Sequence, residues 1–208
     1  MPVFQLDYHT ETAGTVIEEI VPPKENMIAR ITGIIYEAAA TAHTLTVMRA
    51  VANTSCSKYS ASGQTVLNVL QPDAMKDSAG ADEALAANDF VVYQTEDGTY
   101  GASKVSSVSG NAITMTANLA GTVDEGGTIW LMGELARTTH VAMNAKASTV
   151  NILEGLAIQA GLPQQASPKN IRDGANDPLL IQSDNATNAG FLRSISGVYA
   201  AVSDITTT

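Results

Sequence analysis

Histidine is the residue type best suited to bind a metal ion or move a proton, and this 208-residue sequence has three, His9, His43 and His140. None of them has a second ligand at the spacing of a metal-binding motif such as H-x-H or H-E-x-x-H. A joint site would require the fold to bring three distant segments together. We therefore predict hydrogen-bonded or solvent-facing histidines, no metal site and no cofactor.

Cys56 is the only cysteine, so an intrachain disulfide is excluded. A nucleophilic cysteine needs neighbours that stabilise its thiolate, and only Lys58 lies close to Cys56 in sequence. We interpret Cys56 as a small, mostly buried residue.

Two pairs of adjacent carboxylates, Glu18 with Glu19 and Asp124 with Glu125, were considered for acid–base chemistry. Adjacent residues of a strand point to opposite faces, which is poor geometry for joint catalysis. The sequence also lacks a nucleophile elbow, a glycine-rich phosphate loop and a CxxC pair. We predict no catalytic residues and no enzymatic activity.

The stretch RDGANDP (172–178) brings Asp173, Asn176 and Asp177 close together, as in a cation-binding loop. It lacks the spacing and the terminal bidentate glutamate of an EF-hand loop. A turn rich in Asp and Asn explains the stretch without an ion. The sequence leaves open whether these three residues bind a cation.

Charged residues make up only 15% of the chain, against roughly 25% in a typical soluble domain. The 21 acidic and 11 basic residues give a net charge of −10, and the basic residues are scattered singly, which disfavours binding to nucleic acid. Neither a signal peptide nor an apolar run of membrane-spanning length occurs, so we expect a soluble protein made in a cytoplasm and no membrane partner. A low charge density suits a protein that buries much of its surface in a larger assembly.

The apolar residues recur with a period near two, which predicts strands rather than helices. We read residues 72–89 as a connector with at most one or two helical turns, and residues 161–177 as a long surface loop. Outside the middle of the chain, strands are expected at 13–21, 27–36, 43–51, 65–70, 138–144, 149–153, 156–159, 178–183 and 191–202.

Short strands separated by turns fill residues 86–133. The pairs Asp97-Gly98 and Gly110-Asn111 are typical of hairpin turns. This regular spacing indicates a small curled sheet or an SH3-like barrel. We expect Trp130→Ala to melt this barrel while the outer sandwich stays folded. The strands are expected at 90–93, 104–109, 113–116 and 128–132, and the core residues at Val92, Val105, Val108, Ile113, Met115, Ile129, Trp130 and Leu131.

The predicted fold is therefore all-β. Both chain ends, residues 1–71 and 138–208, form an outer β-sandwich, and residues 72–137 form a connector and a small inserted β domain. Insertions of this kind enter at exposed loops of the host domain.

Three stretches resemble virion proteins of tailed bacteriophages. NDFVVYQTEDGTYGASKVSSVSGNAITMTANLAGTVDEGGTIWLMGE (88–134) resembles a small β unit that recurs in these proteins. ITGIIYEAAATAHTLTVMRA (31–50) and NDPLLIQSDNATNAGFLRSISGVYA (176–200) resemble the outer β-sandwich of capsid decoration, or cement, proteins. The resemblance covers about half of the chain and carries over no catalytic residue.

The resemblance implies a structural role on the capsid surface of a virion. The expected partners are the major capsid protein and further copies of the chain, as a homotrimer, which clamp neighbouring shell subunits. The inserted barrel would then either project outward or make the contact between copies.

Two other functions stay open, a tail or fibre-base component and a carbohydrate-binding module. The second is disfavoured because sugar-binding platforms need exposed aromatic residues, and this chain has only ten aromatic residues.

Overall fold

The computed structural model describes residues 3–7, 18–37, 43–77, 80–140, 149–151, 158–159, 177–183 and 191–201. The fold is all-β, which confirms the predicted fold class, and no helix occurs among the described residues. Their strands are grouped into two sheets.

The chain divides into two compact units. The outer unit consists of Met1–Met48 and Glu134–Thr208, and the central unit is residues 49–133. Both passages between the units lie inside strands, β4 (His43–Ser55) and β11 (Thr128–His140), which are hydrogen-bonded neighbours. The central unit is thus inserted through two adjacent strands rather than through loops.

The structure places the start of the central unit earlier than the sequence analysis did. Residues 49–71, which we had assigned to the outer domain, belong to the central unit. The reason is long-range pairing, because β5 (Val66–Asn68) pairs with β10 (Ala112–Met115) and Leu67 is fully buried in the central core. Nothing in the local sequence around residue 49 marks this boundary, because one continuous strand crosses it.

In the outer unit, one sheet joins the two ends of the chain. β15 (Phe191–Ala201) pairs with both β1 (Val3–Asp7) and β3 (Met27–Glu37), and the long β15–β3 pairing runs from Met27 opposite Ala201 to Glu37 opposite Phe191. The short strands β12 (Thr149–Asn151) and β13 (Ile158–Gln159) also pair with β3.

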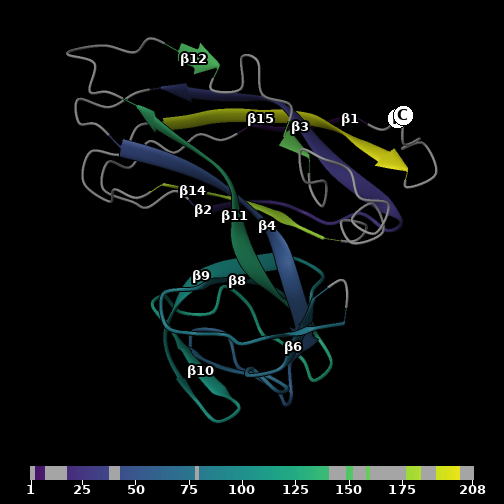
Figure 1. The fold of residues 1–208 in the computed structure, drawn as a ribbon, viewed down its shortest axis with the longest axis vertical. Helices are drawn as coiled ribbons and strands as arrows, with labels where there is room; N and C mark the ends of the chain where they lie inside the picture. Colours follow the sequence, from purple (N-terminus) through teal and green to yellow (C-terminus); the bar gives the residue numbers. More distant parts are fainter. Residues whose placement is uncertain are drawn as a thin grey trace. The chain divides into compact units, whose positions relative to one another are not determined.

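The second sheet contributes β2 (Glu18–Val21) and β14 (Leu179–Ser183) to the outer unit, where β14 lies between β2 and β4. In Figure 1 the strands of the first sheet lie in one layer of this unit, and β2 and β14 lie in another. Side chains from both sheets are buried, among them Val21, Ile28, Val47, Leu179, Leu180, Ile181 and Ile195. This arrangement is the sandwich-like outer part that the sequence predicted.

The connecting segments differ in detail from the prediction. The strand expected at 138–144 is present as far as His140, where it forms the end of β11, and residues 141–144 lie outside the described residues. In place of helical turns, residues 72–89 contain a hairpin of β6 (Met75–Asp77) and β7 (Asp82–Glu83), in which β6 pairs with β4. Except for Asp177, the loop expected at 161–177 lies outside the described residues.

The central unit is a curled antiparallel sheet that returns to its first strand. Its strand order is β4, β11, β8 (Phe90–Gln94), β9 (Tyr100–Ser109), β10 and β5. Residues 55–57, at the end of β4, then pair with β5: the Ser57 N–H donates to the Asn68 carbonyl at 3.0 Å, and the Leu70 N–H donates to the Ser55 carbonyl at 2.8 Å. The pairing closes a barrel-like unit.

The hairpin between β8 and β9 turns at the predicted Asp97-Gly98 pair. Gly98 has a φ of 80°, a conformation that glycine adopts without steric cost. The Thr95 N–H donates to the Thr99 carbonyl at 2.9 Å across the turn. The next hairpin, from β9 to β10, turns at Gly110, whose φ is 55°, so both predicted turns are confirmed.

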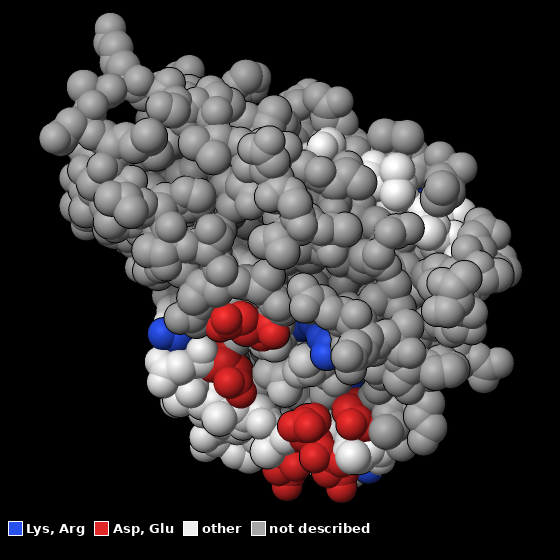
Figure 2. Space-filling view, turned by 45° about the horizontal axis from the view of Figure 1, so that its top comes forward, with Lys and Arg blue, Asp and Glu red and all other residues white. Residues whose placement is uncertain are grey.

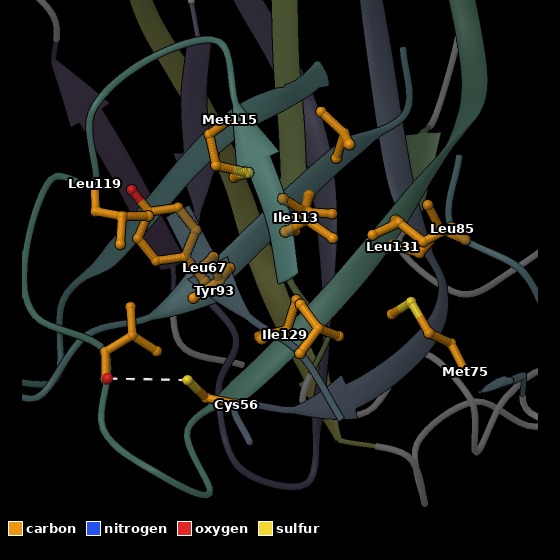
Figure 3. Packing of buried hydrophobic residues seen from close by; sticks show 14 of the residues in the cluster. Cys56, Leu67, Met75, Leu85, Tyr93, Ile113, Met115, Leu119, Ile129 and Leu131 are labelled. Carbon is orange, nitrogen blue, oxygen red and sulfur yellow. Dashed lines mark hydrogen bonds between the residues drawn. The ribbon is translucent and has the colours of Figure 1, made fainter. Parts of the chain in front are cut away.

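The core of the central unit is a single apolar cluster drawn from every strand of the barrel, shown in part in Figure 3. Its members alternate along the strands with residues of the opposite face, as the pleat of a strand requires. The cluster comprises Ala52, Cys56, Leu67, Val69, Met75, Leu85, Val91, Tyr93, Val105, Ile113, Met115, Leu119, Val123, Ile129 and Leu131.

Of the eight predicted core residues, Trp130 and Val92 are buried but do not belong to this cluster. Their neighbours Ile129 and Leu131 do belong to it, so Trp130 and its cross-strand partner Val92 face the other side of the sheet. An apolar run such as Ile-Trp-Leu-Met does not reveal which face is the core. That Trp130→Ala melts the barrel before the rest stays a prediction, which now depends on the burial of Trp130 at the other face of the sheet.

Val108 is exposed, contrary to the prediction that it is a core residue. The alternating burial of β9 ends at Val105, where the pairing with β10 shifts register and Ser106 has no direct partner. Such a bulge increases the local twist of a strand and turns its end away. Residues 106–109 are therefore exposed as a group.

These two valines give a matched test of the core within one strand. Val105 is 1% exposed and Val108 is 36% exposed. We expect Val105→Ala to lower the free energy of unfolding by about 2 kcal/mol, because two buried methyl groups are lost at about 0.8 kcal/mol each and a cavity remains. Val108→Ala should change it by less than about 0.5 kcal/mol. Urea denaturation of both variants measures the difference, and equal effects would show that this core is wrongly assigned.

Candidate functional site

The residues that could carry chemistry are not brought together in the part of the chain that the structure describes. No group of three or more His, Cys, Asp and Glu there could hold a metal ion. His43 is the first residue of β4 and His140 the last of β11, whereas His9, Asp173 and Asn176 lie outside the described residues. The absence of a metal site therefore stays a prediction.

Cys56 is 2% exposed at the end of β4, in agreement with its interpretation as a small buried residue. Its thiol donates to the carbonyl of Lys58 at 3.0 Å and lies 3.9 Å from the carbonyl of Val123, as the dashed line in Figure 3 marks. Burial raises the pKa of the thiol, and this effect outweighs the hydrogen bonds from Ser60 and to Lys58 that lower it. A buried thiol that holds its proton is a poor nucleophile.

Asp124 and Glu125 are both exposed, and they occupy a turn rather than the strand positions that we had considered. The turn lies between Val123, which pairs with Ser60, and Gly126, whose φ is 85°. Side chains in this turn are free to approach each other, but both are solvated.

The second carboxylate pair lies in β2, where Glu18 is opposite Gln182 and Glu19 opposite Ile181. Burial raises the pKa of Glu19 from its usual 4.5 to about 7. The cause is the loss of solvent on burial, which disfavours a charged carboxylate. Asp177, from the suspected cation loop, is partly buried just before β14.

The raised pKa of Glu19 predicts a pH dependence of stability. Between about pH 4.5 and about 7 the folded chain binds more protons than the unfolded chain, so the free energy of unfolding falls as the pH rises. Glu19→Gln has no proton to lose, and its stability relative to the wild type should increase across this window. Denaturation from pH 4 to pH 8 measures the difference, with Glu25→Gln, at an exposed turn position, as the control. A constant difference between Glu19→Gln and the wild type would contradict the prediction.

Sequence reasoning missed one organised carboxylate, Asp97. Its Oδ1 accepts hydrogen bonds from the Thr95 hydroxyl at 2.6 Å, the Thr99 hydroxyl at 2.8 Å and the Thr99 N–H at 3.1 Å. The bond from the Thr95 hydroxyl, followed by those from Thr99, lowers the pKa of Asp97. The pattern T-x-D-G-T could have revealed this turn, in which the bonds that Asp97 accepts from Thr95 and Thr99 stabilise the hairpin.

No known protein family matches this sequence, and no curated protein or solved structure matches it. None of the described residues form a helix long and apolar enough to cross a membrane. The described residues form no metal-binding cluster, so the surfaces of the molecule are the functional candidates considered below.

Proposed function

We propose that this protein is a non-enzymatic structural protein of a bacteriophage virion that binds neighbouring shell subunits and thereby decorates and stabilises the capsid. Its partners are the major capsid protein and other copies of itself, as a homotrimer. It needs neither a cofactor nor nucleic acid nor a membrane, and it is made in the host cytoplasm.

The observation that carries this proposal is the two-unit β architecture. A central unit with its own core is inserted into an outer unit whose sheet joins both chain ends. The strand and turn pattern of the sequence predicted this division into an outer sandwich and an inserted β unit, and stretches of both parts resemble virion proteins. Shell subunits present sheet edges and loops, and strands bind such edges through backbone hydrogen bonds.

Surface chemistry supports the proposal over a carbohydrate-binding module. Among the aromatic side chains whose burial the structure describes, Tyr59 alone is largely exposed, at 60%. A sugar-binding platform stacks sugar rings on exposed aromatic faces, which a lone tyrosine supplies poorly. Low charge and a large share of Ser, Thr, Asn and Ala suit a surface that is buried in an assembly.

The test is co-sedimentation with particles from the same genome. Purified protein is mixed with empty shells assembled from the major capsid protein, and in parallel with isolated tails. We expect saturable binding to shells and none to tails. Binding to tails alone would replace the proposal by a tail or fibre-base role, and binding to neither particle would refute a role in the virion.

A further inference from the structure

Three large exposed apolar side chains of the central unit lie around the strand that closes the barrel. Val66 is 41% exposed, Leu70 is 48% exposed and Tyr59 is 60% exposed. Val66 and Leu70 are four residues apart along β5 and its extension, so they point to the same outward face. Tyr59 lies beside β5, between Ser57, whose N–H donates to the Asn68 carbonyl, and Ser60, whose hydroxyl accepts from the Asn68 N–H.

The cross-strand neighbours of Val66 on this face are small and uncharged, whereas the exposed cation Lys58 adjoins Tyr59. Thr114 of β10 lies opposite Val66, and Ser107 of β9 lies opposite Thr114. The next row across the strands contains Asn68, Ala112 and Ser109. We call the outward side of β5, β10 and the end of β9, together with Tyr59 and Leu70, the neutral face.

The neutral face contrasts with the acidic remainder of the central unit. Residues 50–72 and 98–123, which supply all of the neutral face, contain no Asp or Glu, whereas all nine acidic residues of the unit lie within 73–97 and 124–125. Figure 2 shows acidic side chains gathered in groups rather than spread evenly over the described surface. β5, β10 and the end of β9 thus carry no carboxylate, and the acidic turn of Asp124 and Glu125 adjoins residues 56–60 at the margin of the neutral face.

We propose that the neutral face is the surface through which the central unit packs against another copy of the same chain. Each copy carries a net charge of −10, so copies repel one another wherever carboxylates would meet. The neutral face avoids this repulsion and offers apolar side chains that lose water on contact. Interface cores are depleted of charged residues in the same way.

The charge pattern favours a second copy over a basic partner. A basic partner would be attracted to the acidic parts of the unit, at residues 73–97 and 124–125, rather than to a face without carboxylates. This inference rests on the proposed function in one respect, namely that copies of the chain associate. It adds the surface by which they do so.

The test introduces carboxylates into the neutral face of the full-length chain. The double variant Val66→Glu with Leu70→Glu changes two exposed positions and should leave the fold intact. The matched control, Ala84→Glu with Ala87→Glu, adds the same charge at exposed positions within the acidic stretch. Sedimentation velocity over a wide concentration range measures self-association, and circular dichroism melting verifies folding. Tyr59→Ser tests the same face without adding charge.

We expect the neutral-face variant to weaken self-association by at least about tenfold, since like charges facing each other across an interface are strongly unfavourable. Tyr59→Ser should weaken it less, and the control should leave it close to wild type. Equal self-association of the neutral-face and control variants would overturn the inference, and so would a wild-type chain that stays monomeric.

Salt provides an independent readout. Raising the salt from about 10 mM to about 150 mM shortens the screening length from about 30 Å to about 8 Å. A contact between uncharged faces of acidic copies should tighten, because only repulsion is screened. Weakening by salt would indicate oppositely charged contacts and would contradict the proposed face.

Shell binding by the same variants separates this inference from the proposed function. If the wild type associates through the neutral face but does not bind shells, the proposed function fails and the inference stands. If the neutral-face variant associates normally but no longer binds shells, the face contacts the shell, and the inference fails while the proposed function stands.

Discussion

A fragment consisting of residues 49–133 is expected to fold by itself, whereas a fragment of residues 72–137 is expected to be unfolded. All fifteen members of the central core cluster lie between Ala52 and Leu131. The longer fragment therefore contains the complete core and the segment that closes the barrel. Domains smaller than this one fold without help from disulfides or metals.

The fragment 72–137 corresponds to the inserted domain as the sequence analysis delimited it. It lacks β5 and the central-unit part of β4, and with them the core residues Ala52, Cys56, Leu67 and Val69. Without these strands the sheet cannot close, and one side of the core is open to water. Amide chemical-shift dispersion and a cooperative thermal transition distinguish the two results. A folded 72–137 fragment, or an unfolded 49–133 fragment, would disprove the unit boundaries.

Gly101→Ala is expected to lower the free energy of unfolding of the central unit by about 3 kcal/mol, near the upper end for overpacking of a core. Gly101 lies directly opposite Tyr93, whose ring covers the glycine. A Cβ at position 101 would lie 2.3 Å from Cζ and from the hydroxyl oxygen of Tyr93. The ring cannot move aside easily, because it is fully buried and its hydroxyl accepts a hydrogen bond from the Ala120 N–H at 2.9 Å.

A double-mutant cycle separates this clash from a general preference for glycine. Tyr93→Leu alone leaves a cavity and removes the partner of the Ala120 N–H, so it is destabilising by itself. In its background, Gly101→Ala should cost much less, because the atoms that clash are gone. Urea denaturation followed by the fluorescence of Trp130 measures all four proteins. Additive effects would show that the contact with Tyr93 is not the cause.

Local features of the sequence were sufficient to predict most of the strands. The period-two pattern predicted β3, β4 and β10, because alternation of side chains is a property of the strand itself. The Asp97-Gly98 turn was also predictable, since only glycine adopts its backbone conformation without strain. These features depend on a few neighbouring residues.

Several properties of single side chains depend on pairings that the local sequence does not encode. Val105 and Val108 have the same side chain on the same strand, yet a bulge leaves one buried and the other exposed. Trp130 is apolar and buried, but the pairing of β11 with β8 places it on the face opposite the core. The pKa of Glu19 follows from its burial in β2, a strand whose partner β14 is distant in sequence.

The candidate interaction surface illustrates the same division. The sequence by itself determined that residues 50–72 and 98–123 carry no carboxylate, because charge is a property of composition. Only the tertiary structure decided that these two stretches form one face, since hydrogen bonds join β5 to β10 and β10 to β9. The closing bonds of Ser55 and Ser57 with Leu70 and Asn68 then bring Tyr59 beside β5. Contacts between segments far apart in the chain, rather than local propensity, turn two neutral stretches into a surface.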